Sequence, residues 1–537
     1  MKKLFLLLLI VTASRCWAVS ACDGAGNCYV RAGATGAGSG ADWTNAYPSL
    51  PNNLTRGAVY YVAAGSYPNH TFSDADSGTT VITILAATIA AHGTATGWSD
   101  SYQGQATFTC SSSCMDIIVF QSDYYVFSGV YRSTATGNPE TDWVLEAGYG
   151  FKVNNTNSKA SGAIAAGSGF NGGTCSSVAS CNAQGMFVHD VTVSYVDLDG
   201  AHPSTDSADI DDGFDVEGGS YNITMSHNYV HDDAVPNFIK GSHGNESGGG
   251  YYFGTGNNNV IEYSYIQHNY SSPTYHSEGC SCSEGLTNFT IRYNYFDQIG
   301  GVGGNGSTAM IGTASGADYN NGNGPNGPWY IYGNVFTCTA TLATMNCAAG
   351  DGTLAIWDAQ FTGAVYFLNN TSYNLGPHGP ETADGIGLSQ TTPMTTIDFE
   401  NNLFYEADPM TVIPTGTTNW EDATFSSPIT WSYNSYFDTP LAGSNDGDSH
   451  KQVSSSNPFA SGGVCCSLAS DTTAGVNTQS MLAGTACPPV AGEATCNNTD
   501  LNGTARGASG TWDRGAFQIA GAGTLPVPPT NLTATVH

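Results

Sequence analysis

Acidic residues gather in one short stretch of a chain that is otherwise poor in charge, and a rare lysine follows them. Only 11% of the 537 residues are charged, yet six acids fall within twelve positions: Asp206, Asp209, Asp211, Asp212, Asp215 and Glu217. Lys240 follows in a chain with 13 Lys and Arg residues. Clustered carboxylates are ligands that Ca²⁺ prefers, and a lysine whose pKa is lowered by a nearby cation can accept a proton. The stretch therefore has the composition of a cation site with a base, or of a solvated acidic loop.

The net charge limits the partners of the chain. A formal charge of −31 repels nucleic acids and anionic membranes, so we expect no nucleic-acid partner. It also opposes binding of an acidic polymer by Lys and Arg alone. An acidic substrate would need a bound cation, and Ca²⁺ is the cation that the carboxylates favour.

The first 21 residues have the pattern of a signal peptide. Lys2 and Lys3 precede the apolar run LFLLLLIV, and the small residues VSA follow before Cys22. The apolar run is too short to span a bilayer, so we predict cleavage, secretion and no membrane insertion. Lipidation of Cys22 is the alternative, and the cysteine count opposes it.

Cysteines indicate disulfide-stapled loops. Without the leader, 14 cysteines remain, an even number that suits an exported protein. Two neighbouring pairs, Cys280/Cys282 and Cys465/Cys466, are too close for easy internal bridges and are expected to cross-pair. The other pairs are local: Cys22/Cys28, Cys110/Cys114, Cys175/Cys181, Cys338/Cys347 and Cys487/Cys496.

A short phrase recurs through the middle of the chain and predicts how these residues are positioned. It reads apolar, two residues, Asn or a substitute, one residue, apolar, and its fourth positions are 30 to 40 residues apart, at 196, 228, 264, 294, 334, 370, 402 and 434. This period with an Asn between two short strands predicts a solenoid of parallel strands, in which Asn side chains stack from coil to coil. An antiparallel sandwich is the alternative, but it should show closely spaced Asn-Gly hairpins.

The domain organisation follows from this repeat. We predict one β-helix domain over 22–520, between the signal peptide (1–21) and a flexible Pro/Gly/Thr-rich tail (521–537). Residues 22–185 form the first coils and loops, 186–440 the regular coils with the Asn phrase, and 441–520 a Cys-rich carboxyl-terminal cap. Insertions between phrases would form loops on one side, where a binding face usually lies.

The phrase resembles the right-handed parallel β-helix of the pectate-lyase-like superfamily. Two further segments near the start, Tyr29–Leu50 and Gly57–Phe72, are similar to the first coils of its secreted bacterial members, and Thr499–Gln518 is similar to their last coil. The resemblance implies an all-β, right-handed parallel β-helix. Because fold does not imply function, the site must support any activity.

Within that superfamily, the acidic stretch resembles the family 9 polysaccharide lyases. The phrase that carries this likeness is Asp211-Asp212-Gly213-Phe214-Asp215. The resemblance implies a Ca²⁺ site formed by that phrase with Asp190 one coil earlier, and Lys240 as the catalytic base; the metal ligands would be Asp190, Asp211, Asp212 and Asp215. It implies a secreted lyase that cleaves a uronate-containing polysaccharide by Ca²⁺-assisted β-elimination. Lys240 stands one place later than the lysine of the family, and one place turns a strand side chain to the other face.

Further residues are candidates for the substrate cleft, and two other functions compete. The cleft candidates are Asp232, Asp233, His276, Glu278 and Arg292. An inverting glycoside hydrolase on the same fold could use Asp232 and Asp233 with Asp211 or Asp212, if an acid and a base lie roughly 6.5–9.5 Å apart. The G-H-G and R-I-K phrases of the polygalacturonases are absent. The third possibility is a non-catalytic glycan-binding, adhesive or structural surface protein, with Tyr and Trp side chains stacking on sugars.

Overall fold

The structure is a computed structural model that describes most of the first coils and the regular parts of the later ones. The described residues are 22–154 (without 95, 111–113 and 115), 162–167, 187–200, 212–216, 220–232, 249–253, 256–267, 278–283, 286–297, 308–314, 327–337, 350–356, 363–373, 386–388, 395–405, 429–437, 448–459, 468, 475–485, 490, 493, 495–506 and 512–519.

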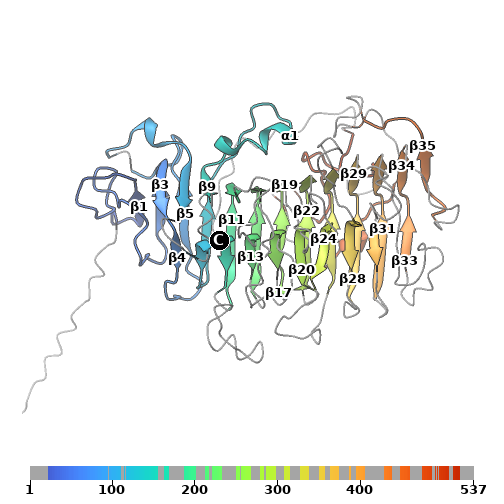
Figure 1. Ribbon diagram of the computed structural model, residues 1–537, viewed down its shortest axis with the longest axis horizontal. Helices are drawn as coiled ribbons and strands as arrows, with labels where there is room; N and C mark the ends of the chain where they lie inside the picture. The colour runs from blue at the N-terminus through green and yellow to red at the C-terminus, as the bar shows by residue number, and fades with distance from the viewer. Residues whose placement is uncertain are drawn as a thin grey trace, which may run out of the picture.

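Three long sheets of parallel strands build the molecule, and successive strands lie side by side along its long axis (Figure 1). Sheet A contains β1 (Asn27–Val30), β2 (Val59–Val62), β5 (Ile82–Ala86), β8 (Tyr125–Ser128), β11 (His189–Ser194), β14 (Tyr221–Ser226), β18 (Val260–Glu262), β22 (Phe289–Arg292), β25 (Trp329–Tyr332), β28 (Ala364–Leu368), β31 (Thr396–Glu400) and β33 (Ile429–Ser432).

Sheets B and C complete each coil. Sheet B contains β3 (Gly65–Pro68), β6 (Ala106–Thr109), β9 (Phe151–Asn154), β12 (Val196–Asp199), β15 (Tyr229–His231), β19 (Tyr265–Gln267), β23 (Tyr295–Asp297), β26 (Val335–Thr337), β29 (Thr371–Tyr373), β32 (Leu403–Tyr405), β34 (Ser435–Phe437) and β35 (Gln452–Ser454). Sheet C contains β4 (His70–Phe72), β7 (Asp116–Phe120), β10 (Gly162–Ala166), β13 (Asp212–Val216), β16 (Gly249–Phe253), β20 (Glu278–Ser283), β24 (Thr308–Ala314), β27 (Gly350–Ile356) and β30 (Ile386–Leu388).

The chain passes from sheet C to sheet A to sheet B and back, as in the circuit β13, β14, β15, β16. This confirms the predicted parallel β-helix. The short strands β17 (Gly256–Asn257) and β21 (Leu286–Thr287) pair with each other, and the short helices are η1 (Asp100–Tyr102), α1 (Pro139–Asp142), η2 (Glu146–Gly148) and α3 (Gln479–Leu482).

Apolar side chains from the three sheets fill the interior of the coils. They alternate with outward-facing residues along each strand, as in β14, where Ile223 and Met225 are fully buried and Thr224 between them is half-buried. Equivalent rings stack from coil to coil, for example Phe296 on Phe336. Each buried side chain of this size contributes about 1.5–3 kcal/mol of transfer free energy, so the interior column is the main source of stability.

The predicted asparagine stack is present at the corner between sheets A and B. Asn294, Asn334, Asn370 and Asn402 are all buried. The side-chain amide of Asn294 donates to Asn334 Oδ1 at 3.0 Å, and that of Asn334 donates to Asn370 Oδ1 at 3.0 Å. Each amide also donates to a backbone carbonyl one coil back, such as Asn334 Nδ2 to Ile291 O at 3.0 Å. The ladder therefore satisfies the polar backbone groups of a buried turn.

Tyrosines form a second apolar cluster outside the coils. Tyr229, Tyr265 and Tyr295 project from sheet B, and Trp143 packs edge-on against Tyr295 with ring centroids 5.5 Å apart. Residues from the carboxyl-terminal segment, including Phe517, belong to the same cluster. This segment packs along the side of the coils.

Disulfides occur where local pairs were predicted, with one difference. Cys22 bonds to Cys28 and Cys110 to Cys114, which confirms two local pairs. The expectation that Cys280 and Cys282 cross-pair with other cysteines is wrong, because they bond to each other within β20. Residues two apart in a strand face the same side, so both sulfur atoms reach the interior. No helix among the described residues is long and apolar enough to cross a bilayer.

Candidate functional site

Strand β13 carries the described part of the predicted acidic site. It lies in sheet C between β10 and β16, and the half-buried Asp215 pairs in register with Ala165 on one side and Tyr252 on the other. At the start of the strand, Asp212 pairs with Gly249, and Gly249 pairs with Glu278. The sheet thus brings Asp212 and Glu278 into one row two strands apart, although 66 residues separate them in sequence. Glu278 is completely buried, and it is on the same side of β20 as Cys280 and Cys282, which face the interior, so it does not line an open cleft.

Several predicted residues lie outside the described part of the chain, namely Asp211, Asp233, Lys240 and His276. The connectivity around Lys240 is nevertheless clear. Its segment joins β15, which ends at His231, to β16, which begins at Gly249. Gly249 is the register partner of Asp212, so the chain that contains Lys240 leads directly to the strand beside the acidic phrase.

The structure does not place Asp190 beside the acidic phrase. Asp190 lies in β11 of sheet A, where its carboxylate contacts His189 Nδ1 at 2.7 Å and accepts a hydrogen bond from Asn222 Nδ2 at 3.2 Å. The strand that precedes β13 in sheet C is β10. Asp190 and strand β13 therefore lie on different sheets, because a coil here takes 32 residues, the separation of Asp190 and Asn222, and Asp212 follows Asp190 by only 22 residues.

Arg292 and Asp232 also lie away from the row in sheet C. Arg292 is 1% exposed, and it pairs with Glu262 at 2.6 Å and donates to the Tyr332 hydroxyl at 3.0 Å. It therefore supports the outer side of sheet A and does not lie beside the acidic row. Asp232 directly follows the last residue of β15 in sheet B, and its carboxylate contacts His231 Nδ1 at 2.8 Å.

A charged cluster on the outer side of sheet B was not anticipated from the sequence. We call it the Lys152 cluster; its members are Glu146, Lys152, Asp197, Asp199 and His231. Lys152 Nζ lies 2.5 Å from Glu146, 3.2 Å from Asp197 and 2.6 Å from Asp199. His231 Nε2 lies 2.8 Å from Asp197 Oδ1.

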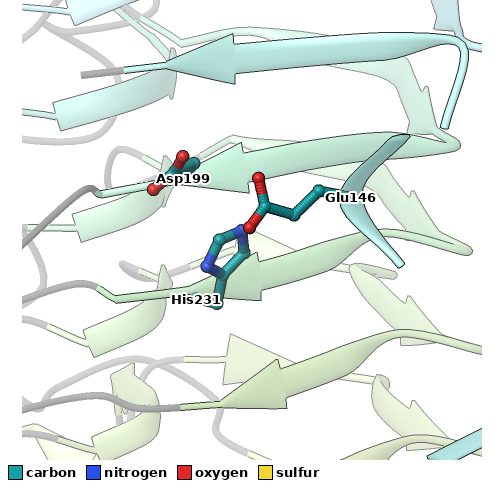
Figure 2. A group of neighbouring side chains, drawn as sticks. All are labelled: Glu146, Asp199 and His231. Carbon is teal, nitrogen blue, oxygen red and sulfur yellow. The ribbon is translucent and has the colours of Figure 1, made fainter. Parts of the chain in front are cut away.

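Adjacent strands and one covering turn position these side chains. Lys152 pairs in register with Asp197, and Asp199 pairs with His231, on β9, β12 and β15. Glu146 reaches the group from η2, and Figure 2 shows the side chains of Glu146, Asp199 and His231 pointing toward one another. One ligand atom from each of these three lies within 4.8 Å of the others, so the trio has the donor set of a metal site. The Lys152 ammonium already lies among its carboxylates.

The electrostatics of the cluster keep both cations charged. Burial opposes the charged form of His231, but hydrogen bonds to Asp197 and Asp232 outweigh it and raise its pKa to about 10. Burial likewise opposes the charged form of Lys152, but Asp197, Asp199 and Glu146 together raise the pKa of the ammonium. A base must be neutral to take a proton, so Lys152 is a structural counter-ion at neutral pH.

The sequence carried a weak signal for this cluster. Lys152 and Asp197 are 45 residues apart, and Asp199 and His231 are 32 apart, so only correct coil lengths would align them. The spacing of 32 residues between Asp199 and His231 matches the Asn phrase. Asp199 and His231 each lie three residues after the fourth position of a phrase, at 196 and at 228. The first spacing crosses the irregular segment before Val193 and could not be aligned from the phrase.

Comparisons with known proteins give structural likeness alone. No protein-family model matches the sequence, and no curated protein matches it. Solved structures that are similar include pectate lyase Pel9A, with 12% identity over 92% of this chain and 96% of that chain and a TM-score of 0.41. A PL6 family alginate lyase, AlyGC, has 13% identity over 81% of this chain and 54% of that chain, with a TM-score of 0.35. The Agl-KA catalytic domain has 13% identity over 74% of this chain and 62% of that chain, with a TM-score of 0.21.

Proposed function

We propose that the protein is a secreted polysaccharide lyase that cleaves a uronate-containing polysaccharide by Ca²⁺-assisted β-elimination. The observation that supports this most is the position of β13 in sheet C. Its acidic residues lie beside β16, the strand to which the Lys240 segment leads. Base and acids would then meet at the start of two adjacent strands.

The distribution of basic residues supports Lys240 as the base. Every Lys and Arg among the described residues has an interaction partner; for example, Arg132 stacks on Trp143 and Arg514 donates to Asn434 O, while Lys451 also has a partner. Beyond the leader, only Lys159 and Lys240 lie outside the described residues. Lys159 precedes β10 and Lys240 precedes β16, the two strands that flank β13.

The acidic phrase has the donor chemistry that Ca²⁺ requires. Asp211, Asp212 and Asp215 offer hard carboxylate oxygens, and Asp190 is left out because it lies on sheet A. A Ca²⁺ ion bound there would attract the uronate carboxylate and stabilise the negative charge that develops beside it.

The residues of the chain would carry out the proton transfer. The neutral Lys240 amine takes the proton from C5 of the uronate, the C5–H electrons form a C4–C5 double bond, and the C4–O bond breaks. The leaving oxygen then takes up a proton from water. The reaction needs no water nucleophile, so a pair of carboxylates at hydrolase spacing is not required.

The two competing functions gain less support. A hydrolase that uses Asp232 would need one carboxylate from the end of β15 in sheet B and the others from β13 in sheet C, so its acid and base would come from two different sheets. A binder of the kind expected from the sequence would need exposed aromatic rings. The described Tyr and Trp side chains are instead buried or half-buried, many of them in stacks.

The test is incubation with polygalacturonate and with alginate in the presence of Ca²⁺, followed by the ultraviolet absorbance of the unsaturated product. We expect Lys240→Ala to lower the rate about 10²- to 10⁴-fold and Lys451→Ala, the matched control beside β35 of sheet B, to leave it unchanged. A loss with Lys159→Ala in place of Lys240→Ala would contradict the assignment of the base. Chelation should abolish activity, and Asp215→Asn should raise the Ca²⁺ concentration that gives half-maximal activity. New reducing ends without the absorbance would show a hydrolase. If neither new reducing ends nor the absorbance appear, the glycan-binding function is the remaining candidate.

A further inference from the structure

A groove of about 440 Å³ lies on the outer face of sheet A, away from the acidic row in sheet C. We call it the sheet A groove. It runs across four neighbouring strands, β8, β11, β14 and β18. Residues at equivalent positions of these strands form two parallel rows along it. One row contains Tyr124, Asp190, Asn222 and Asn258, and the other contains Val126, Thr192, Thr224 and Val260.

The first row is a ladder of side chains fixed by an unusual backbone. Tyr124, Asp190, Asn222 and Asn258 all have left-handed φ angles, between 54° and 61°. Asn222 Nδ2 donates to Asp190 Oδ1 at 3.2 Å, and Asn258 Nδ2 donates to Asn222 Oδ1 at 3.1 Å. A carboxamide has two N–H groups and two acceptor lone pairs. The ladder uses part of this capacity: each Nδ2 donates one of its two N–H groups within the ladder, so the second N–H of Asn222 and of Asn258 remains for a ligand, whereas Asn258 Oδ1 is buried.

The second row adds hydroxyl groups. Thr192 and Thr224 are register partners and are both half-buried. Their hydroxyls form no hydrogen bond to any of the residues that the structure describes. Two unengaged hydroxyls beside two amides make a surface that can donate and accept hydrogen bonds along its length.

The spacing of these groups suits an extended sugar chain. Neighbouring strands lie about 4.8 Å apart, which is close to the length of one pyranose residue in an extended equatorially linked chain. Successive coils therefore place side chains at intervals close to one sugar residue, with hydroxyls on the two central strands and Val126 and Val260 on the outer two. The half-buried Tyr124 ring lies in the first of the four strands, where an aromatic face can pack on sugar C–H groups.

The charge of the groove selects a neutral ligand. Asp190 lines it, and Asp123 lies next to it, with the His189 ring between them at 2.8 Å from Asp123 and 2.7 Å from Asp190. No Lys or Arg is among the described residues that line it; Arg56 donates to the backbone oxygen of Tyr124 but is paired with Asp76. A chain of carboxylates would be repelled, whereas a chain of hydroxyls would not.

We propose that the sheet A groove binds a neutral, extended hexopyranose chain. This site is distinct from the proposed lyase site and does not depend on it. It would let the protein hold a neutral polysaccharide while sheet C acts on an acidic one. The ligand class follows from the unengaged hydroxyls on β11 and β14, the amides on β14 and β18, the spacing of the strands and the acidic surroundings.

The test is isothermal titration of the full-length mature protein with cellohexaose, and with maltohexaose and hexagalacturonate as probes of shape and charge. We expect binding of cellohexaose alone. Thr224→Val keeps the shape of the side chain and removes the hydroxyl, so it should weaken binding about fivefold. Asn222→Ala should weaken it further. Thr107→Val, at a half-buried outward position of sheet B, is the matched control and should change nothing.

Each alternative result has a definite meaning. No binding of cellohexaose, equal binding of either other probe, or equal weakening by Thr107→Val would overturn the proposal. The Lys240→Ala protein should bind cellohexaose as well as the unmodified protein does. A failed lyase assay with intact cellohexaose binding would therefore refute the lyase proposal alone.

Discussion

Replacing Lys152 by Met tests whether the Lys152 cluster holds the loop over sheet B to the coils. Methionine is unbranched and similar in length, so it fills the space of the lysine stem while the ammonium is lost. The change leaves Asp197, which is fully buried, and Asp199 without their shared cation. His231 still contacts Asp197, which reduces the loss.

The expected magnitude follows from the burial of each partner. Glu146 is half-exposed, so its pair with Lys152 contributes at most about 1 kcal/mol. Breaking a buried pair by removing one partner costs about 3–5 kcal/mol. Because His231 compensates in part, we expect a loss of about 3 kcal/mol in the free energy of unfolding. Urea denaturation followed by circular dichroism measures it, with the half-buried Lys451→Met as control, for which less than about 1 kcal/mol is expected.

Metal rescue makes the same variant more decisive. Without the ammonium, Glu146, Asp199 and His231 retain ligand atoms within 4.8 Å of one another, and Zn²⁺ that binds them must displace a proton from the His231 ring. Zn²⁺ at 100 times its dissociation constant should restore about 2.7 kcal/mol to the variant. It should leave the unmodified protein unchanged, because the raised pKa of Lys152 keeps the ammonium in place. A small loss of stability, or an equal effect of Zn²⁺ on both proteins, would refute the electrostatic role of the cluster.

Three further predictions concern pH and the asparagine ladder. The charged His231 ring stabilises the folded protein fully below its ordinary pKa of 6.5, and this contribution is lost as the pH rises toward about 10. His231→Gln should therefore flatten the fall of the urea midpoint between pH 7 and 10, and an unchanged slope would contradict the raised pKa of His231. Burial, with the nearby charge of Asp297, raises the pKa of Glu140 to about 7, so stability is lost as pH rises from 4.5 through 7, and thermal unfolding of Glu140→Gln should lack this loss. Asn334→Ala leaves buried groups of Asn294 and Ile291 without partners and should cost about 3 kcal/mol in urea unfolding; a cost below about 1 kcal/mol would show that the ladder is dispensable.

The regular coils could be predicted from sequence because Asn marks the same corner in six of the eight phrases. Asn294, Asn334 and Asn370 occupy a buried turn whose backbone groups a small, self-pairing amide satisfies, so the phrase recurs although the loops between the phrases vary in length. The site could not be aligned in the same way. Asp190 and Asp215 are close in sequence, but the switch between sheets separates them, whereas Asp212 and Glu278 are distant in sequence and share a row. Loop lengths decide such alignments, and they carry no periodic signal.

Local chemistry was predictable only where neighbours in sequence decide it. Cys22 and Cys28 could be paired from their spacing. Cys280 and Cys282 were not paired with each other, because that bond depends on both side chains facing the interior of a strand. The Lys152 cluster similarly depends on register between β9 and β12 across an irregular segment.

The carboxyl-terminal segment has a consequence for how the coils come apart. It returns along the side of the molecule and contacts coils far from its own, since Glu493 accepts from Tyr293, and Asn369 and Asn434 interact with Asp513 and Arg514. A plain solenoid interacts only between neighbours and can fray from its end one coil at a time. Here the segment acts as a tie across several coils, so a pulling force on the carboxyl end must first detach it. The coils from β22 to β33 should then yield together in a single mechanical event.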